Sequence, residues 1–175
     1  VQTCALPISA DLAAAVTHLT HPQPEVLAAA RQFAKWTVRA LEGVPRERLF
    51  AAQSDAKVDG NGAEDAARGA VGGAELLREA AARGDAPSVL RLAQWALSST
   101  TSYKEAVLKV INAGGHADVM GATVGALAGA MYGARSLPVH WLQSLHSRDR
   151  IVHLADQLLV TALTRLLEEP DRVRA

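Results

Sequence analysis

A stretch of sixteen residues without charge, 119–134, restricts the folds open to this chain more than any other feature. Glycine recurs within it at every fourth position, at Gly121, Gly125, Gly129 and Gly133. This spacing predicts a helix with one face free of side chains, which another backbone can approach closely. The stretch is shorter than the roughly 20 apolar residues that cross a bilayer. We therefore expect a helix at the centre of a packed bundle.

The composition favours helices along the whole chain. Of the 175 residues, 49% are hydrophobic, which suits one domain with a sizeable core, but only 4% are aromatic. Lys+Arg and Asp+Glu count 18 each, so no net basic field favours nucleic acid or an anionic membrane surface. We predict an all-α protein with neither partner. Without a signal-like segment or structural cysteines, the expected location is cytoplasmic.

The first eight residues, Val-Gln-Thr-Cys-Ala-Leu-Pro-Ile, look like the translation of a sequencing-library adapter rather than native sequence. On this interpretation Cys4, the single cysteine, is not native, and the native sequence begins near Ser9, partway into a reading frame. A short natural N-terminal extension is the alternative. We expect one domain over residues 9–169 and a charged tail over 170–175.

Apolar periodicity and helix-stop residues predict the other helices. Ser102 and Glu105 form a capping box, in which the Ser102 hydroxyl accepts the Glu105 N–H and the Glu105 carboxylate accepts the Ser102 N–H. Asp118 is expected in the first turn of the glycine helix and as its N-cap, and Asp149 as the N-cap of the last helix. Besides the glycine helix, the predicted helices cover residues 10–19, 24–42, 63–83, 87–98, 103–113, 138–145 and 149–167, with a short turn at 46–53.

The loop at 54–62 partly matches a calcium-binding loop through Asp55 and Asp59. Lys57 occupies the third ligand place, and Ala66 the twelfth, where a bidentate Glu is required. We expect solvated loop residues and no calcium.

Several motifs follow one another in a distinctive order. The segment Leu19-Thr20-His21-Pro22 precedes Ser102-Tyr103-Lys104-Glu105, which is followed by Gly114-Gly115-His116-Ala117-Asp118, the glycine helix, Leu137-Pro138 and Trp141. Over most of residues 10–160 this order and spacing resemble the C-terminal half of the ADP-ribosylglycohydrolase family. The resemblance implies an orthogonal multi-helix bundle, N-terminally truncated here. It also implies metal-dependent hydrolysis of the glycosidic bond between ADP-ribose and a modified target.

In that family the Gly-Gly turn is followed by Asp-x-Asp-Thr, whose side chains help to bind a pair of Mg²⁺ or Mn²⁺ ions. By position Asp118 matches the second acid, His116 replaces the first and Val119 replaces the threonine. The resemblance thus makes Asp118 and His116 the metal-ligand candidates in an altered motif, because valine has no ligand oxygen and imidazole is softer than carboxylate. As an alternative, His116 is a turn residue that took the place of a lost aspartate.

The resemblance further implies His21, Gly114 and Gly115 as substrate-binding residues, although His21 could equally serve packing. The family's other metal ligands form an acidic cluster that would precede Ser9. We therefore assign no catalytic residue and expect the chain as given to be inactive. The implied partner is an ADP-ribosylated protein or a small ADP-ribosyl ligand. The alternative function is a non-catalytic family member that acts as a ligand-binding or structural module.

Overall fold

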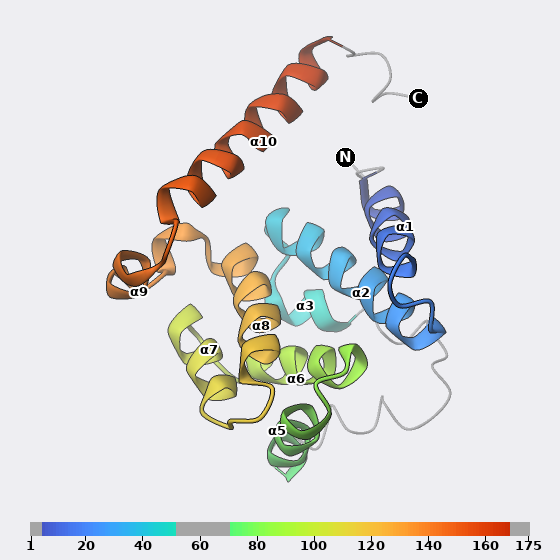
Figure 1. The fold of residues 1–175 in the computed structure, drawn as a ribbon, viewed down its shortest axis with the longest axis vertical. Helices are drawn as coiled ribbons and strands as arrows, with labels where there is room; N and C mark the ends of the chain where they lie inside the picture. Colours follow the sequence, from blue (N-terminus) through green and yellow to red (C-terminus); the bar gives the residue numbers. More distant parts are fainter. Residues whose placement is uncertain (1–4, 52–70, 169–175) are drawn as a thin grey trace. The chain divides into compact units, whose positions relative to one another are not determined.

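The computed structural model describes residues 5–51 and 71–168, and the chain divides into two compact units, Val1–Ser136 and Leu137–Ala175. The described residues form helices and contain no strand, so the all-α prediction is confirmed. In the first unit the elements, labelled in Figure 1, are α1 (Ala5–His18), α2 (Pro24–Leu41), α3 (Arg46–Ala51), α5 (Val71–Arg83), α6 (Ala86–Ser98), α7 (Tyr103–Ile111), α8 (Ala117–Tyr132) and the short 3-10 helix η1 (Ala134–Ser136).

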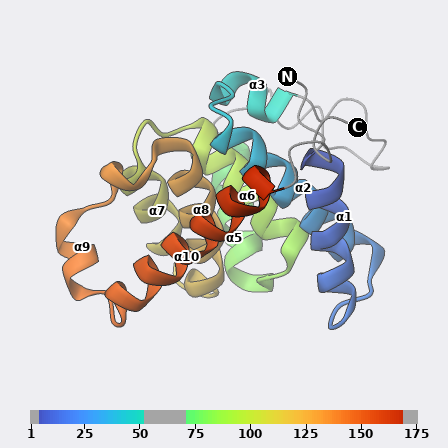
Figure 2. The ribbon, with the colours of Figure 1, turned by 90° about the horizontal axis from the view of Figure 1, so that it is seen from above.

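The glycine helix, α8, lies at the centre of the first unit. In Figures 1 and 2 it stands between α7 on one side and α2 and α6 on the other, in agreement with its packing partners. A Cβ atom added at Gly121 would lie 2.8 Å from a methyl carbon of Ile111, and one at Gly125 would lie 3.3 Å from the Tyr103 hydroxyl. A close approach is therefore present at these two glycines, which face α7, but side chains make it instead of the predicted backbone. Gly129 has no neighbour within 4 Å at the same position.

The core of this unit is built mainly from α6 and the inner face of α8. The first contributes Leu92, Ala93 and Leu97 at 0% exposure, because apolar residues cover most of its circumference. Trp36 of α2 is 1% exposed and packs edge-on against Phe50 of α3, with ring centroids 5.0 Å apart. Burial of these side chains holds together helices that would be marginal in isolation.

A second close helix contact joins α5 to α6. A Cβ atom at Gly73 would overlap the indole ring of Trp95, with ring atoms closer than 3.0 Å. At neighbouring Gly72 the same atom would meet nothing within 4 Å. Of these two glycines, Gly73 alone marks a close packing contact. Asp85 caps α6 by accepting the N–H of Ser88 at 2.9 Å.

The capping predictions hold in part. Ser102 accepts the N–H of Glu105 at 3.2 Å, as expected at the start of α7. The Glu105 carboxylate accepts mainly the N–H and the hydroxyl of Thr101, both at 3.1 Å, and the Ser102 N–H contributes less. The Ser102 prediction is confirmed, and the main partner of the Glu105 carboxylate is the residue before the predicted one.

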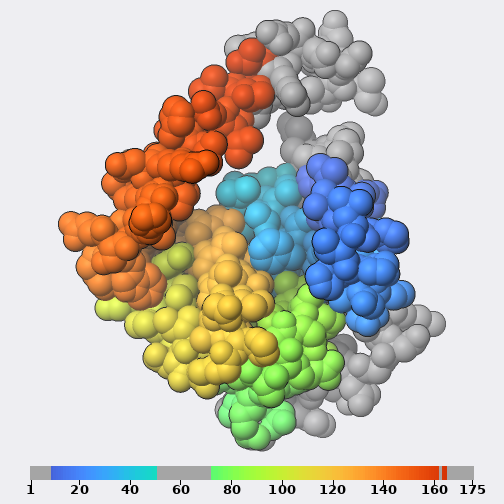
Figure 3. Space-filling model, in the orientation of Figure 1, coloured from blue at the N-terminus to red at the C-terminus, as the bar shows by residue number. Residues whose placement is uncertain are grey.

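Helix α1 begins at Ala5, ahead of the native start expected near Ser9. The origin of residues 1–8 stays a prediction. Cys4, the loop at 54–62, the predicted helix start at 63–70 and the tail at 170–175 lie outside the described residues. On the outer face of α1, which Figure 3 shows in blue at the edge of the first unit, Leu12 and Val16 are exposed.

The second unit contains α9 (Val139–Ser144) and α10 (Arg148–Glu168). Asp149 lies in the first turn of α10, one residue inside it, so its predicted role as N-cap is wrong. Ser147 stands before the helix with a φ of 59° and accepts the N–H of Ile151 through its carbonyl. Within this unit Leu158 and Leu163 remain exposed. None of the helices in the described part of the chain is long and apolar enough to cross a membrane.

Candidate functional site

The segment that carries the predicted site, residues 113–116, connects α7 to α8, and we call it the site loop. Gly114 and Gly115 have φ values of 73° and 59°, a left-handed conformation that glycine adopts without a steric penalty. Two such residues in succession reverse the chain within a short distance. The turn brings His116 to the N-cap position of α8, where its carbonyl accepts the N–H of Met120 at 3.0 Å.

The site loop is fastened to the last turn of α5. The His116 N–H donates to the carbonyl oxygen of Ala81 at 3.1 Å. The last four carbonyl groups of a helix receive no hydrogen bond from within the helix, so the His116 N–H provides one of them with a donor. A Cβ atom on Gly115 would lie closer than 3.0 Å to the same carbonyl oxygen, whereas one on Gly114 would meet nothing. Gly115 is therefore a packing requirement as well as a turn residue.

The imidazole ring of His116 lies against Gly84, the residue that follows α5. A Cβ atom at Gly84 would be 2.5 Å from Cγ, 2.6 Å from Cδ2 and 2.8 Å from Nδ1 of the ring. His116 is nevertheless exposed overall, and its side chain does not cap α8. The sequence predicted that this helix ends at residue 83 but gave no sign that the next residue, Gly84, would meet His116.

Asp118 lies in the first turn of α8, as predicted, and is exposed. The predicted N-cap role is wrong, because His116 occupies that position and the helix begins two residues earlier than a cap at Asp118 would require. The carboxylate takes part in none of the hydrogen bonds or ion pairs among the described residues. It still benefits from the positive end of the helix dipole. Val119 follows it at 39% exposure and offers no oxygen.

The donors around the site loop do not complete a metal site. Asp118 contributes a carboxylate and His116 an imidazole, but no group of three His, Cys, Asp or Glu residues suited to a metal exists within residues 5–51 and 71–168. Mg²⁺ and Mn²⁺ favour several oxygen ligands. These residues alone therefore do not fit such an ion, and we derive no reaction step through one.

His21 lies in the turn between α1 and α2. Its Nδ1 is 2.9 Å from the hydroxyl of Thr20. Figure 1 shows this turn and the site loop at different sides of the first unit. Across the described ranges, no hydrogen bond or ion pair joins His21 to His116 or Asp118. The structure thus places His116 and Asp118 two residues apart at the start of α8 and leaves His21 apart from both.

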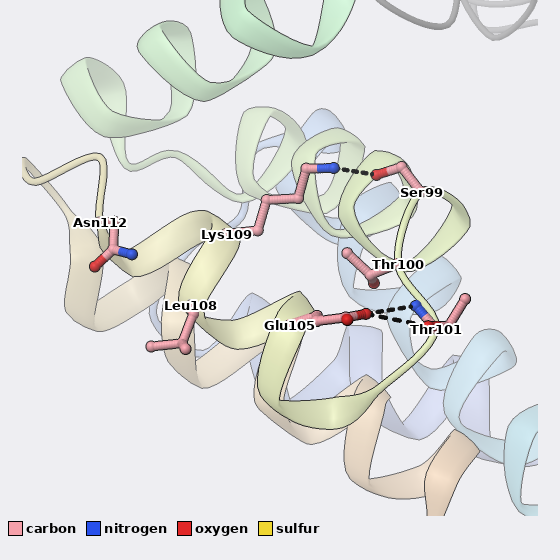
Figure 4. Close-up of a pocket in the computed structure, with 7 residues that line it drawn as sticks. All are labelled: Ser99, Thr100, Thr101, Glu105, Leu108, Lys109 and Asn112. Atoms are coloured by element: carbon pink, nitrogen blue, oxygen red, sulfur yellow. Dashed lines mark hydrogen bonds between the residues drawn. The ribbon is translucent and has the colours of Figure 1, made fainter.

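Sequence reasoning did not anticipate a shallow depression where α6 meets α7, with a volume of about 550 Å³. Figure 4 shows the Lys109 ammonium donating to the Ser99 hydroxyl, at 2.9 Å, and Glu105 bound to Thr101. Lys109 also lies over the Trp95 ring, 4.3 Å from its centroid. Asn112 and Leu108 complete the wall. The charged side chains in this depression are already engaged by neighbours.

Glu105 has the clearest electrostatic perturbation on this surface. Hydrogen bonds from the backbone N–H of Thr101 and then from its hydroxyl, with smaller contributions from Ser102, hold the pKa of Glu105 below its ordinary value. Nearby, burial raises the pKa of the Tyr103 phenol. The lowered pKa keeps the Glu105 carboxylate ionised, and the raised pKa keeps the Tyr103 phenol neutral.

An all-α bundle whose central glycine helix begins with an exposed acid, behind a Gly-Gly turn, defines a narrow class of protein. The model of the ADP-ribosylglycohydrolase family matches residues 5–168 of this chain. The chain therefore belongs to the ADP-ribosylglycohydrolase family, and the resemblance noted in the sequence is confirmed.

Three relatives share shorter segments with the chain. The ADP-ribosylarginine hydrolase Tri1 of Serratia proteamaculans (strain 568) is 41% identical over 73 residues, 42% of this chain and 20% of the relative. The Tri1 protein of Pseudomonas putida (strain GB-1) is 35% identical over 69 residues, 39% of this chain and 19% of the relative. The ADP-ribosyl-[dinitrogen reductase] glycohydrolase of Rhodospirillum rubrum is 44% identical over 65 residues, 36% of this chain and 22% of the relative.

One solved structure, titled an ADP-ribosylglycohydrolase-related protein complex, has a similar fold. Its TM-score is 0.64 at 32% identity, and the alignment covers 83% of this chain and 50% of that one. The matched segments thus span about a fifth of each curated relative and half of the solved chain. The fold assignment follows from the family and from this likeness.

Proposed function

We propose that the protein serves the hydrolysis of the glycosidic bond between ADP-ribose and a modified target, and that the target is an arginine side chain of an ADP-ribosylated protein. The family match over residues 5–168 is the observation that carries this proposal. The arginine linkage is supported by two relatives named ADP-ribosylarginine hydrolase. In such a reaction water adds to the anomeric carbon, the carbon–nitrogen bond breaks, and the released guanidine takes the remaining proton. A small ADP-ribosyl ligand is the other substrate class, and the cytoplasm is the proposed location.

We further propose that a divalent cation, Mg²⁺ or Mn²⁺, takes part and that Asp118 and His116 contribute to its binding. Both side chains are exposed and belong to the start of α8, His116 at its N-cap position and Asp118 in its first turn. Two donors are too few to hold such a cation firmly. The proposal therefore requires further ligands from residues outside the described ranges. The change to His116 and Val119 favours a site with weaker affinity than one built from carboxylates.

Substrate contacts are proposed for Gly114, Gly115 and His21. Gly114 supports the proposal best, because its backbone is exposed and has no neighbour within 4 Å on the side where a Cβ would stand. A ligand can therefore approach its peptide groups closely. Gly115 faces the Ala81 carbonyl on that side, so a substrate contact is less well supported there than at Gly114. His21 contributes only if the ligand extends to the turn between α1 and α2.

The alternative is a non-catalytic family member that acts as a ligand-binding or structural module. The contact of the His116 ring with Gly84 supports it, since a packed imidazole serves the fold without any cation. The aliphatic side chain of Val119, where the family has threonine, also supports the non-catalytic alternative.

Calorimetric titration with MnCl₂ or MgCl₂, with and without ADP-ribose, tests the two functions on the 175-residue chain and on the full-length product of its gene. The hydrolase proposal expects metal binding that Asp118→Asn weakens at least about tenfold, together with release of ADP-ribose from an ADP-ribosylarginine peptide. Asp149→Asn is the matched control, because Asp149 also stands in the first turn of a helix. Binding of ADP-ribose without metal or turnover supports the module, and no binding of either in the full-length product rules out the hydrolase.

A further inference from the structure

The face of the His116 ring, rather than its edge, rests on Gly84. The three ring atoms nearest to a Cβ built on Gly84 are Cδ2, Cγ and Nδ1, which are bonded in sequence. Their distances from that Cβ differ by little, 2.6, 2.5 and 2.8 Å. A point almost equidistant from three consecutive ring atoms lies above the ring plane. Gly84 therefore provides a flat surface on which the imidazole lies.

Two separate properties of Gly84 permit this arrangement. Its φ of 61° is strained for a residue with a side chain, and its Cβ position is already filled by the ring. Gly43 has only the first of these properties. It also follows a helix with a positive φ, 78°, but a Cβ atom built on it would meet no atom within 4 Å. The occupied space is thus particular to Gly84, whereas the left-handed backbone is common to both helix ends.

The end of α5 also holds the backbone of His116. The His116 N–H bond to Ala81 fixes the main chain, and the contact with Gly84 restricts the ring. An exposed side chain otherwise keeps rotamer freedom that must be given up when it binds a ligand. Fixing the main chain and the ring before binding reduces this entropic penalty.

We propose that Gly84 is a positioning residue, which holds the His116 imidazole in one orientation beside the first turn of α8. This inference rests on the proposed function for the part that concerns ligands, since it assigns Gly84 the task of pre-organising one of the two donors. Gly84 itself touches no ligand in this scheme. Its contribution is the absence of a side chain, which lets the end of α5 serve as the support for the ring.

A thermal-unfolding cycle on the whole chain tests the contact without any ligand. We expect Gly84→Ala to lower the melting temperature by about 3 °C more than Gly43→Ala, the control for backbone strain alone. In the His116→Ala background the two substitutions should lower the melting temperature equally, because the ring that blocks the new methyl group at position 84 is gone. An excess that persists without the ring, or no excess in the native background, overturns the proposal.

The orientation of the ring has its own spectroscopic signature. In ¹H–¹⁵N spectra of imidazole nitrogens, Gly84→Ala should shift or broaden the His116 resonances and leave those of His140 in place, while Gly43→Ala moves neither. Unchanged His116 resonances in Gly84→Ala would contradict positioning, even if stability falls. Addition of MnCl₂ then distinguishes the positioning role of Gly84 from the proposed metal binding by His116. If the His116 resonances do not change on addition of Mn²⁺, only the metal proposal is contradicted, because the unfolding cycle and the shift of the ring resonances are measured without metal.

Discussion

The carbonyl oxygen of Ala81 accepts a hydrogen bond from the backbone N–H of His116, at 3.1 Å, and so ties the site loop to the end of α5. The bond joins residues that are distant in sequence and gives an otherwise unpaired helix carbonyl its donor. It also explains why the second glycine of the Gly-Gly turn admits no side chain. The position of Asp118 depends on this attachment, because α8 begins directly after it.

Replacement of Gly115 should loosen this attachment more than replacement of Gly114. Gly114→Ala meets only the cost of a left-handed alanine, about 1 kcal/mol, because its Cβ would have free space. Gly115→Ala adds an overlap with the Ala81 carbonyl, which is backbone and cannot rotate away, so we expect a further loss of about 1–3 kcal/mol. Urea denaturation of the two variants measures the difference. Equal losses would show that the loop can move off α5 at little cost.

Neighbouring glycines in α5 should respond to alanine in opposite directions. Gly72→Ala should stabilise the protein by about 0.5–1 kcal/mol, because the position is open and alanine is the better helix former. Gly73→Ala should destabilise it, since the new methyl group would overlap the Trp95 indole, at a cost of about 1–3 kcal/mol. Free energies of unfolding from denaturant titration check both signs. Stabilisation by both substitutions would contradict the close packing of α5 on α6.

Stability should depend on the ionisation of Glu105. Because hydrogen bonds from Thr101 lower its pKa in the folded state, the contribution of Glu105 is present above the pKa of the unfolded chain and is lost as the pH falls through the lower, folded value. Glu105→Gln should therefore reduce the melting temperature at pH 7, and the difference from the native protein should vanish in acid. Glu25→Gln is the comparison, since Glu25 also lies in a helix first turn. A difference that is independent of pH would contradict the role of the carboxylate.

Restoring the family's residues at two positions should raise metal affinity. The double substitution His116→Asp and Val119→Thr supplies two further hard oxygen ligands, and we expect Mn²⁺ to bind at least about tenfold more tightly in the full-length product. The control is the same pair of changes in an Asp118→Asn background, where the gain should be lost. Unchanged affinity in the full-length product would mean that the remaining ligands are absent or displaced. Calorimetry with MnCl₂ measures both variants.

Much of the helical architecture was predictable because its determinants are local. The helix predicted over 24–42 and the cap predicted at Ser102 each depend on residues within one or two turns, and both appear close to where they were expected. The errors are also local: Asp118 and Asp149 were expected as N-caps, whereas each is the second residue of its helix. A short acidic side chain satisfies the first turn and the cap almost equally well, so sequence does not separate the two positions.

The sequence by itself determined that the chain is all-α, that a glycine helix lies at its centre, and that it carries the motif order of the ADP-ribosylglycohydrolase family. These properties follow from periodicity, glycine spacing and the order of short motifs. Only the tertiary structure decided that Gly115 and His116 meet Ala81 and Gly84. That contact depends on how α5 and α8 pack around α6, and packing between distant segments leaves no periodic trace in either one.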